Sequence, residues 1–305
     1  MEKILKIWDM TWFHSSNPTN KDLKEIKDAY DLHEIIEDDL YEANTQDKID
    51  VYDDFIFLVL HFPKFNNRTK TYFSNEFNII LWKDFIISLT KYETNHVEKI
   101  RKEYFEDLEA WKDDFKVSPY YILYVLMDVM YDKVLSGINK FNKDLNVIES
   151  GIFEWKKLNQ ALIEKLLVKR RNSIVLKHIM LPQEEILEEL SKVTLKKYKW
   201  ELDVYFEDLQ YKQDKIMSHI SIANESTMTL SDTYNSLMSV KMNAMISVLT
   251  IFTAIIWIMT FITGLYGMNV HLPLQNFNST FALILWFMLF IASGTIIFFR
   301  KKGWL

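Results

Sequence analysis

The pattern of hydrophobic and polar residues changes its period along this chain of 305 residues. In the first third, short runs rich in β-branched and aromatic residues predict strands, and apolar residues at helical spacing predict a helix over residues 21–42. We expect these elements to form an α/β domain over residues 1–115. The predicted strands are residues 4–12, 55–62 and 77–90.

The middle of the chain has a helical period. Ser118-Pro119 is a favourable helix start, and breaks are expected near Gly151 and at Leu181-Pro182, which predicts a helical segment over residues 116–182. From Gln183 to Thr263 there follow 81 residues without Gly or Pro, and no turn signal interrupts them. A single helix of that length would extend about 120 Å and would need neighbours, which identical subunits around an axis supply most simply.

Two long apolar runs near the end of the sequence predict membrane-spanning helices. Both runs lack charged residues, and each is long enough to cross about 30 Å of hydrocarbon. A pair of buried core helices is the alternative, but both runs are apolar on nearly every face. The predicted order is a long stalk helix (183–243), a first span (244–266), an external loop (267–280), a second span (281–299) and a basic tail (300–305).

Charge is distributed unevenly along the chain. All 42 acidic residues and 32 of the 36 basic residues precede Thr233, so this part carries a net charge of −10. Such a surface suits cations and is a poor match for nucleic acid. Lys241 precedes the first span and basic residues follow the second, whereas residues 270–280 are uncharged. The positive-inside rule therefore predicts a protein of the cell (inner or plasma) membrane with both termini in the cytoplasm.

The sequence offers little support for enzymatic chemistry. It contains no cysteine, which excludes thiolate metal sites and thiol nucleophiles, and its seven histidines show no paired ligand spacing. No GxSxG elbow and no GxxxxGK[ST] phosphate loop is present. We therefore expect a protein that is not an enzyme and that does not itself use ATP as an energy source.

Polar and small residues share one stripe of the first span. An amide, three hydroxyls and two glycines on one face of an apolar helix should face protein or water rather than lipid. From the residues alone, the stripe could pack helices together or line a pore. Alternating steps of three and four residues give its positions, which are Asn243, Ile246, Thr250, Thr253, Trp257, Thr260, Gly264 and Gly267.

The end of the first span resembles a known family. Tyr266-Gly267-Met268-Asn269 closes the span, and the second span ends in the basic tail RKKGWL. In this position, after a long uninterrupted run, Gly-Met-Asn resembles the signature of the CorA family of magnesium and cobalt transporters. Met180-Leu181-Pro182 and Tyr205-Phe206-Glu207-Asp208 extend the similarity upstream. The resemblance implies a homopentameric funnel in which cytosolic α/β domains precede long stalk helices that continue into pore-lining first membrane helices.

The resemblance also implies roles for individual residues. Mg²⁺, and with it Co²⁺ or Ni²⁺, would be the substrate, moved by the membrane potential, and Mg²⁺ would also be a regulatory ligand. Partners would be further copies of the chain, the lipid bilayer and divalent cations. The implied sites are the selectivity element at the pore mouth (Gly267, Met268, Asn269), the pore lining (Thr260, Trp257, Thr253, Thr250, Leu249, Ile246, Asn243), the regulatory metal ligands (Asp208, Glu207) and a basic collar (Arg300, Lys301, Lys302).

The chemistry at Asn269 can be argued independently. Mg²⁺ sheds its waters reluctantly, so a ring of neutral amide and carbonyl acceptors can recognise the hydrated ion without binding it too tightly for release. The alternative for Asn269 is a helix C-terminal residue in a left-handed conformation.

Three features depart from the family's pattern. His271 and Leu272-Pro273-Leu274 stand where many relatives carry acidic residues, which puts in doubt the concentration of cations at the mouth. Trp257 replaces a frequent methionine and Ile258 a common proline. Two further interpretations therefore stay open, a Zn²⁺ transporter of the same architecture and a membrane-anchored oligomeric scaffold or sensor without transport.

Overall fold

Six strands form one mixed sheet, in the order β1-β2-β6-β5-β4-β3, in the computed structural model of the chain. Only β2 and β6 pair in parallel, and the other neighbours are antiparallel. The strands are β1 (Glu2–Ile7), β2 (Met10–Ser16), β3 (Lys48–Val51), β4 (Ile56–Asn66), β5 (Thr71–Leu81) and β6 (Phe85–Thr90). The structure describes residues 2–7, 10–30, 34–41, 44, 46–92, 96–100, 118–154, 159–198, 203–270 and 279–303.

Two of the segments predicted as single strands each include parts of two strands. The run 4–12 divides into β1 and β2, which pair antiparallel with Ile7 opposite Met10. The run 77–90 divides into the end of β5 and β6, where the Trp82 N–H donates to the Phe85 carbonyl (2.9 Å) across Lys83-Asp84. The residues between these strands, 8–9 and 82–84, include neither Gly nor Pro, so composition did not mark the reversals. The predicted helix 21–42 likewise comprises α1 (Asn20–Tyr30) and α2 (Glu34–Tyr41).

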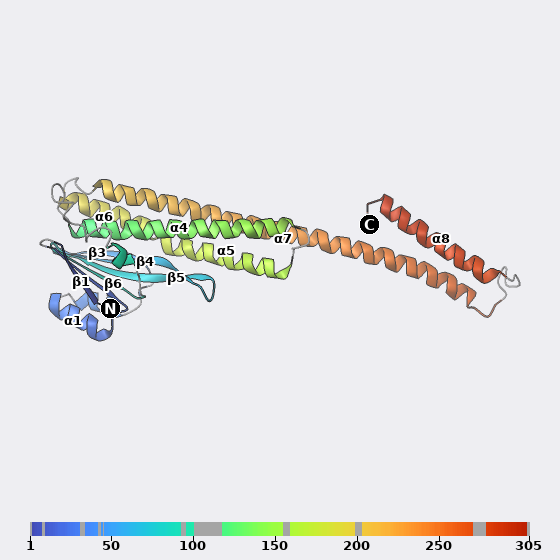
Figure 1. Cartoon of the computed structure of the whole chain (residues 1–305), viewed down its shortest axis with the longest axis horizontal. Helices are drawn as coiled ribbons and strands as arrows, with labels where there is room; N and C mark the ends of the chain where they lie inside the picture. Colours follow the sequence, from blue (N-terminus) through green and yellow to red (C-terminus); the bar gives the residue numbers. More distant parts are fainter. Residues whose placement is uncertain are drawn as a thin grey trace. The chain divides into compact units, whose positions relative to one another are not determined.

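Both faces of the sheet are covered, which explains the unbroken apolar run of β4. In β4, Leu58, Leu60 and Phe62 belong to a core shared with the long helices, whereas Phe57 and Val59 belong to a core shared with α1 and α2. This alternation follows from the two-residue period of a strand. Figure 1 shows α1 on one side of the sheet and α4 to α6 on the other. The predicted α/β architecture is confirmed.

The helical layer begins where the sequence predicted. Ser118 caps α4, accepting a hydrogen bond from the Tyr121 N–H (3.2 Å) with Pro119 in the first turn. Asn159 caps α5 in the same manner, accepting from the Leu162 N–H (3.1 Å). The helices are α3 (His96–Ile100), α4 (Pro119–Phe153), α5 (Gln160–Met180), α6 (Gln183–Tyr198), α7 (Asp203–Tyr266) and α8 (Thr280–Lys301).

The stretch 183–263 is not one helix, contrary to the prediction. The Ser191 hydroxyl donates to the Asp203 carboxylate (3.3 Å), although residues twelve apart in one helix would be separated by about 18 Å. The chain therefore reverses between α6 and α7. Residues 199–202, which lie outside the described residues, carry neither Gly nor Pro, so the reversal left no turn signal.

Further hydrogen bonds confirm that α7 runs back along α6 and α5. The Gln213 side chain donates to the Met180 carbonyl, and the Ser173 hydroxyl donates to Asn224 Oδ1 (3.1 Å). Partner numbers fall along α6 and α5 as they rise along α7, which is the signature of an antiparallel arrangement. The first 29 residues of α7 thus belong to the N-terminal compact unit, residues 1–231.

The second compact unit, residues 232–305, holds the remainder of α7 and all of α8. Both helices have the length and hydropathy of membrane spans, in agreement with the two predicted spans. α7 continues without interruption from Asp203 to Tyr266, so the predicted passage from a long helix into the first span is confirmed. Residues 271–278 of the predicted external loop, including His271 and Pro273, lie outside the described residues.

A buried amide fastens the β4–β5 hairpin to α5. Asn172 is 1% exposed, and its Oδ1 accepts from the Tyr72 N–H (3.1 Å) while its Nδ2 donates to the Lys70 carbonyl (2.8 Å). Lys70 has a positive φ of 59°, as a tight hairpin turn requires. One side chain thus satisfies two backbone groups on a separate element and holds the hairpin in place.

An ion pair and an amide tie the sheet to α6. His61 on β4 contacts Asp47 through Nδ1 and Oδ1 (2.5 Å), and both side chains are buried. The side chain of Gln183, the first residue of α6, donates to the His61 carbonyl (2.5 Å). Although burial opposes its charge, the hydrogen bond to Asp47 raises the pKa of His61. Asp47 and Gln183 are contacts that the sequence analysis did not anticipate.

Candidate functional site

The predicted pore-lining stripe lies on an uncovered face of α7. Its large side chains are exposed, with Trp257 at 72% and Ile246 at 53%. A different face of the same segment is partly covered and includes Ile251, which is 4% exposed. In α8, the partly buried residues also share one face, since they recur at intervals of three and four. The stripe is therefore separate from the face that packs within its own unit.

The threonines of the stripe direct their hydroxyl protons into the helix. Thr250, Thr253 and Thr260 each donate to the carbonyl four residues earlier, at 2.8 Å in every case. A hydroxyl has one proton and two lone pairs, so these oxygens present acceptors to whatever lies outside the helix. The stripe therefore carries weak, neutral oxygen ligands between apolar side chains.

The Gly-Met-Asn segment begins directly at the end of α7. The Gly267 N–H donates to the Thr263 carbonyl (2.9 Å), and a Cβ at position 267 would lie only 3.2 Å from that oxygen. Glycine thus permits the tight close of the helix. Asn269 is exposed, and its φ is not positive. The alternative interpretation of Asn269 as a left-handed helix terminus is therefore wrong.

The predicted basic collar lies at the C-terminal end of α8. Arg300 and Lys301 belong to the last turn and Lys302 follows it, a position at which positive charges stabilise the helix dipole. All three side chains are exposed, and Lys302 lies over the Phe298 ring, 5.8 Å from its centroid. Gly303 closes the helix with a φ of +72°.

The predicted regulatory acids occupy the second turn of α7. Phe206 and Leu209 are fully buried in the core, which turns Glu207 outward and leaves Asp208 half-buried. The Tyr124 hydroxyl of α4 donates to Asp208 Oδ2 (3.4 Å). Burial and the nearby charges of Asp128 and Asp208 raise the pKa of Tyr124, which further favours the protonated hydroxyl that donates this hydrogen bond.

A lysine that the sequence analysis missed lies beside these acids. Lys212, one turn after Asp208, contacts Asp128 and also binds Asp132 (3.1 Å), both on α4. Burial raises the pKa of Asp128 even though Lys212 opposes the shift. The two pairs, Asp128 with Asp132 and Asp208 with Lys212, each have the four-residue spacing that places side chains on one helix face. This four-residue spacing was the sequence signal that could have identified Lys212 and Asp128 as neighbours of the predicted acids.

These acids do not by themselves form a metal site within one protomer. Across the described ranges, no three His, Asp or Glu side chains come together in a manner that could hold an ion. Glu207 faces outward and Asp208 is bonded to Tyr124, so the two do not converge on a common point within the protomer.

Comparison with known proteins identifies relatives along the whole chain. The family model described as CorA-like Mg²⁺ transporter protein matches residues 9–301. The Bacillus subtilis protein YfjQ is 27% identical over 294 residues, which cover 96% of this chain and 89% of the relative. The cobalt/magnesium transport protein CorA of Thermotoga maritima is 23% identical over 310 residues, covering 100% and 87% of the two chains.

The solved structures show the same fold. The complete structure of the CorA magnesium transporter from Methanocaldococcus jannaschii superposes with a TM-score of 0.82 at 20% identity, and the match covers 99% of this chain and 93% of that one. The correspondence therefore includes both the sheet-containing unit and the two C-terminal helices.

Proposed function

The chain belongs to the CorA-like Mg²⁺ transporter family, and we propose that it is a channel-type transporter that conducts hydrated Mg²⁺ along the threonine stripe of α7. The observation that carries the proposal is the uncovered stripe that ends in Gly267-Met268-Asn269. Co²⁺ and Ni²⁺, which share the oxygen-rich coordination of hydrated divalent ions, would be further substrates. Members of this family are transporters rather than enzymes.

A pore of this kind needs several copies of the chain. One helix cannot enclose a path, and the stripe residues Trp257 and Ile246 are exposed in the described part of the protomer. Five copies, with α7 inside and α8 outside, would place every stripe on the central axis and close the assembly by rotation. The exposed tail residues Arg300, Lys301 and Lys302 would then form a basic ring.

The ion would enter at Asn269. A ring of amide oxygens accepts protons from the waters that Mg²⁺ retains, and its neutral charge keeps the binding weak enough for release. Thr260, Thr253 and Thr250 would offer further acceptors along the path, because their hydroxyl protons are already engaged. Leu249 and Ile246, both exposed, would form an apolar constriction that closes by dewetting, with Asn243 beyond it.

The membrane potential would supply the energy. An ion with two charges that moves inward gains about 4.6 kcal/mol per 100 mV, which corresponds to an accumulation of roughly a few thousandfold. The segment 270–280, which contains no Lys, Arg, Asp or Glu, and the basic tail support an orientation with both termini in the cytoplasm of a plasma or inner membrane.

Closure would depend on Asp208 and Glu207. With Glu207 exposed and Asp208 only half-buried, each can reach a Mg²⁺ ion shared with a neighbouring copy. Bound Mg²⁺ would offset the repulsion between carboxylates and hold the ring closed, and loss of the ion would loosen it.

The test is Mg²⁺ entry, reported by an enclosed dye, into liposomes that contain the purified protein under an inside-negative potential. We expect Asn269→Ala to reduce the initial rate at least about tenfold, while the exposed control Asn146→Ala on α4 leaves it unchanged. Equal rates for Asn269→Ala and wild type would remove Asn269 as the selectivity element. No flux of any ion would support the scaffold interpretation, and preferential Zn²⁺ entry would support a zinc transporter.

A further inference from the structure

A buried histidine on β4 contacts two oxygens at once. His61 Nδ1 lies 2.5 Å from Asp47 Oδ1, and its Nε2 lies 3.1 Å from the Asn44 carbonyl oxygen. An ionised carboxylate and a carbonyl oxygen only accept hydrogen bonds, so both ring nitrogens must carry a proton to make these contacts. The geometry therefore requires the charged imidazolium in a side chain that is only 8% exposed.

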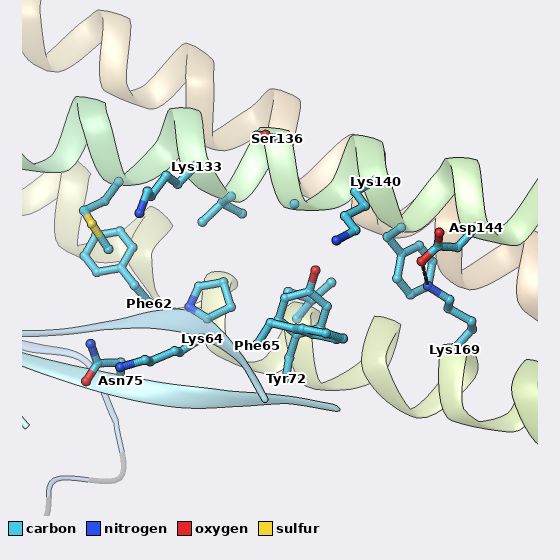
Figure 2. Close-up of a pocket in the computed structure, with 16 residues that line it drawn as sticks. Phe62, Lys64, Phe65, Tyr72, Asn75, Lys133, Ser136, Lys140, Asp144 and Lys169 are labelled. Atoms are coloured by element: carbon cyan, nitrogen blue, oxygen red, sulfur yellow. Dashed lines mark hydrogen bonds and ion pairs between the residues drawn. The ribbon is translucent and has the colours of Figure 1, made fainter. Parts of the chain in front are cut away.

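Strand alternation places this histidine on the sheet face that α1 and α2 cover. Phe57, on the same side of β4, belongs to the core shared with those helices, whereas Phe62 belongs to the core of the opposite face. On that opposite face, Phe62 lines a cavity between the β4–β5 hairpin and α4, with Lys133 and Lys140 on the α4 side, as Figure 2 shows. The His61 side chain therefore lies on the α2 side of the sheet, away from this cavity.

The charges around His61 balance while it is protonated. Asp47 and Glu76 are the carboxylates that act on it, and Glu76 lies opposite it on β5. Glu76 pairs with Lys91 (3.7 Å), and Asp47 Oδ2 has no hydrogen-bond partner among the described residues. Two cations thus face two carboxylates, and loss of the His61 proton leaves one negative charge in excess.

The groups that neighbouring elements bring to this pair do not change charge near neutral pH. Burial and the charge of Asp47 raise the pKa of Tyr131 on α4 well above its ordinary value, so this phenol stays neutral. Gln183 of α6, which donates to the His61 carbonyl (2.5 Å), is an amide. Lys48, which follows Asp47 in the chain, pairs with two other carboxylates. Among these groups, His61 is therefore the one that titrates near neutral pH.

The contact with Asn44 is the one that a neutral His61 would lose. A neutral imidazole has a single N–H, and keeping it on Nδ1 preserves the hydrogen bond to the charged Asp47. Nε2 would then direct a lone pair at the Asn44 carbonyl oxygen, which removes one hydrogen bond and adds repulsion. Although burial opposes the charge, the hydrogen bond to Asp47 raises the pKa of His61, so this proton is lost above about pH 6.5.

Asn44 in turn holds the end of α2. Its Nδ2 donates to the Asp39 carbonyl (2.8 Å) in α2 and to Glu76 Oε1 (3.1 Å) on β5. The Asp39 carboxylate itself pairs with Lys48 of β3. Contacts from His61 through Asn44 to Asp39 therefore join a titrating group in the sheet to a helix that covers it.

We propose that His61, Asp47 and Asn44 form a proton-dependent latch, which holds the end of α2 on the sheet while His61 is charged and loosens it when His61 becomes neutral. Gln183 binds the His61 backbone, which titration does not alter, so α6 keeps its contact with β4. The latch thus confines the response to pH to one face of the sheet. It is separate from the stripe of α7 and does not depend on the transport proposal.

The test is amide hydrogen exchange of the full-length protein in lipid nanodiscs at a series of pH values from 6 to 9. Each rate is divided by the intrinsic rate of the same peptide at the same pH, so that only changes in protection remain. We expect the protection of α2 to fall at least about tenfold with rising pH, in a transition that involves one proton. Peptides of α1 and α6 should change by less than about threefold.

Two variants and a matched control separate the latch from a general loss of stability. His61→Gln removes the titrating group and should abolish the pH response of α2, whereas His178→Gln, at an exposed histidine of α5, should leave the response unchanged. Asp47→Asn removes the charge that favours the imidazolium, so the midpoint should move at least about one pH unit lower. The wild-type and Asp47→Asn curves decide the matter even if His61→Gln does not fold.

Three results would overturn the proposal. The first is a wild-type α2 whose protection does not change with pH. The second is a loss of protection in α1 and α6 as large as that in α2, because the pair would then affect only overall stability. The third is a midpoint that Asp47→Asn leaves in place, because the titrating group would then not be the partner of Asp47.

Discussion

The amide that holds the β4–β5 hairpin to α5 offers a quantitative prediction. Asn172→Ala removes the acceptor of the Tyr72 N–H and the donor to the Lys70 carbonyl. The Tyr72 N–H would be left without a partner in a partly buried position, at a cost of about 1–3 kcal/mol. Lys70 is exposed, so water can replace its lost bond, which adds only about 1 kcal/mol. We therefore expect the hairpin to lose about 2–4 kcal/mol.

Amide hydrogen exchange of the full-length protein, followed by mass spectrometry, measures this loss locally. At about 1.4 kcal/mol per tenfold change, peptides covering residues 66–76 should exchange roughly 30- to 700-fold faster in the variant. Peptides from α4 should change little, and Asn146→Ala, an exposed asparagine of α4, serves as the control. Unchanged protection at residues 70–72 would show that Asn172 does not hold the hairpin.

Two further predictions concern ionised groups. Lys212→Gln leaves Asp128 and Asp132 without the positive charge that they share, so the pKa of Asp128 should rise further. At pH 7.5 the melting temperature should fall, by the equivalent of about 1 kcal/mol in the free energy of unfolding for these partly exposed groups. The difference from wild type should shrink as the pH falls through the pKa of Asp128, and a constant difference from pH 4 to 8 would contradict the assignment. His61 has a raised pKa in the folded state, so its contribution to stability is complete below about pH 6.5 and is lost as the pH rises through the raised value. The melting temperature of the wild type should therefore fall more between pH 6 and 9 than that of His61→Gln, and parallel curves would refute the pair with Asp47.

The sequence predicted the kinds of elements more reliably than their reversals. The apolar runs of β4 and of the two spans are long and uninterrupted, so periodicity and length identified them. The reversals between β1 and β2, between β5 and β6, and between α6 and α7 contain neither Gly nor Pro. The reversal between α6 and α7 is accompanied by the contact of Ser191 with Asp203, which joins residues from different elements and leaves no local signature.

The same distinction applies to the sites. The stripe of α7 and Gly267-Met268-Asn269 are local features, so their spacing could be recognised without a structure. Lys133 and Lys140 resemble ordinary solvated positions of an amphipathic helix, and only the packing of the β4–β5 hairpin against α4 turns them into the wall of a cavity. Lys212 was missed for the same reason, because its partners lie about eighty residues earlier in the chain.

The direction of the threonine hydroxyl groups on α7 affects whether the stripe favours cations or anions. An anion such as chloride is solvated by proton donors, and along this stripe the protons of Thr250, Thr253 and Thr260 point back at carbonyls of their own helix. If the stripe lines a pore as proposed, a negative ion would exchange its hydration for lone pairs at these threonines and lose solvation there. A helix can in this way repel chloride without a single formal charge, which leaves carboxylates free for roles elsewhere in the chain.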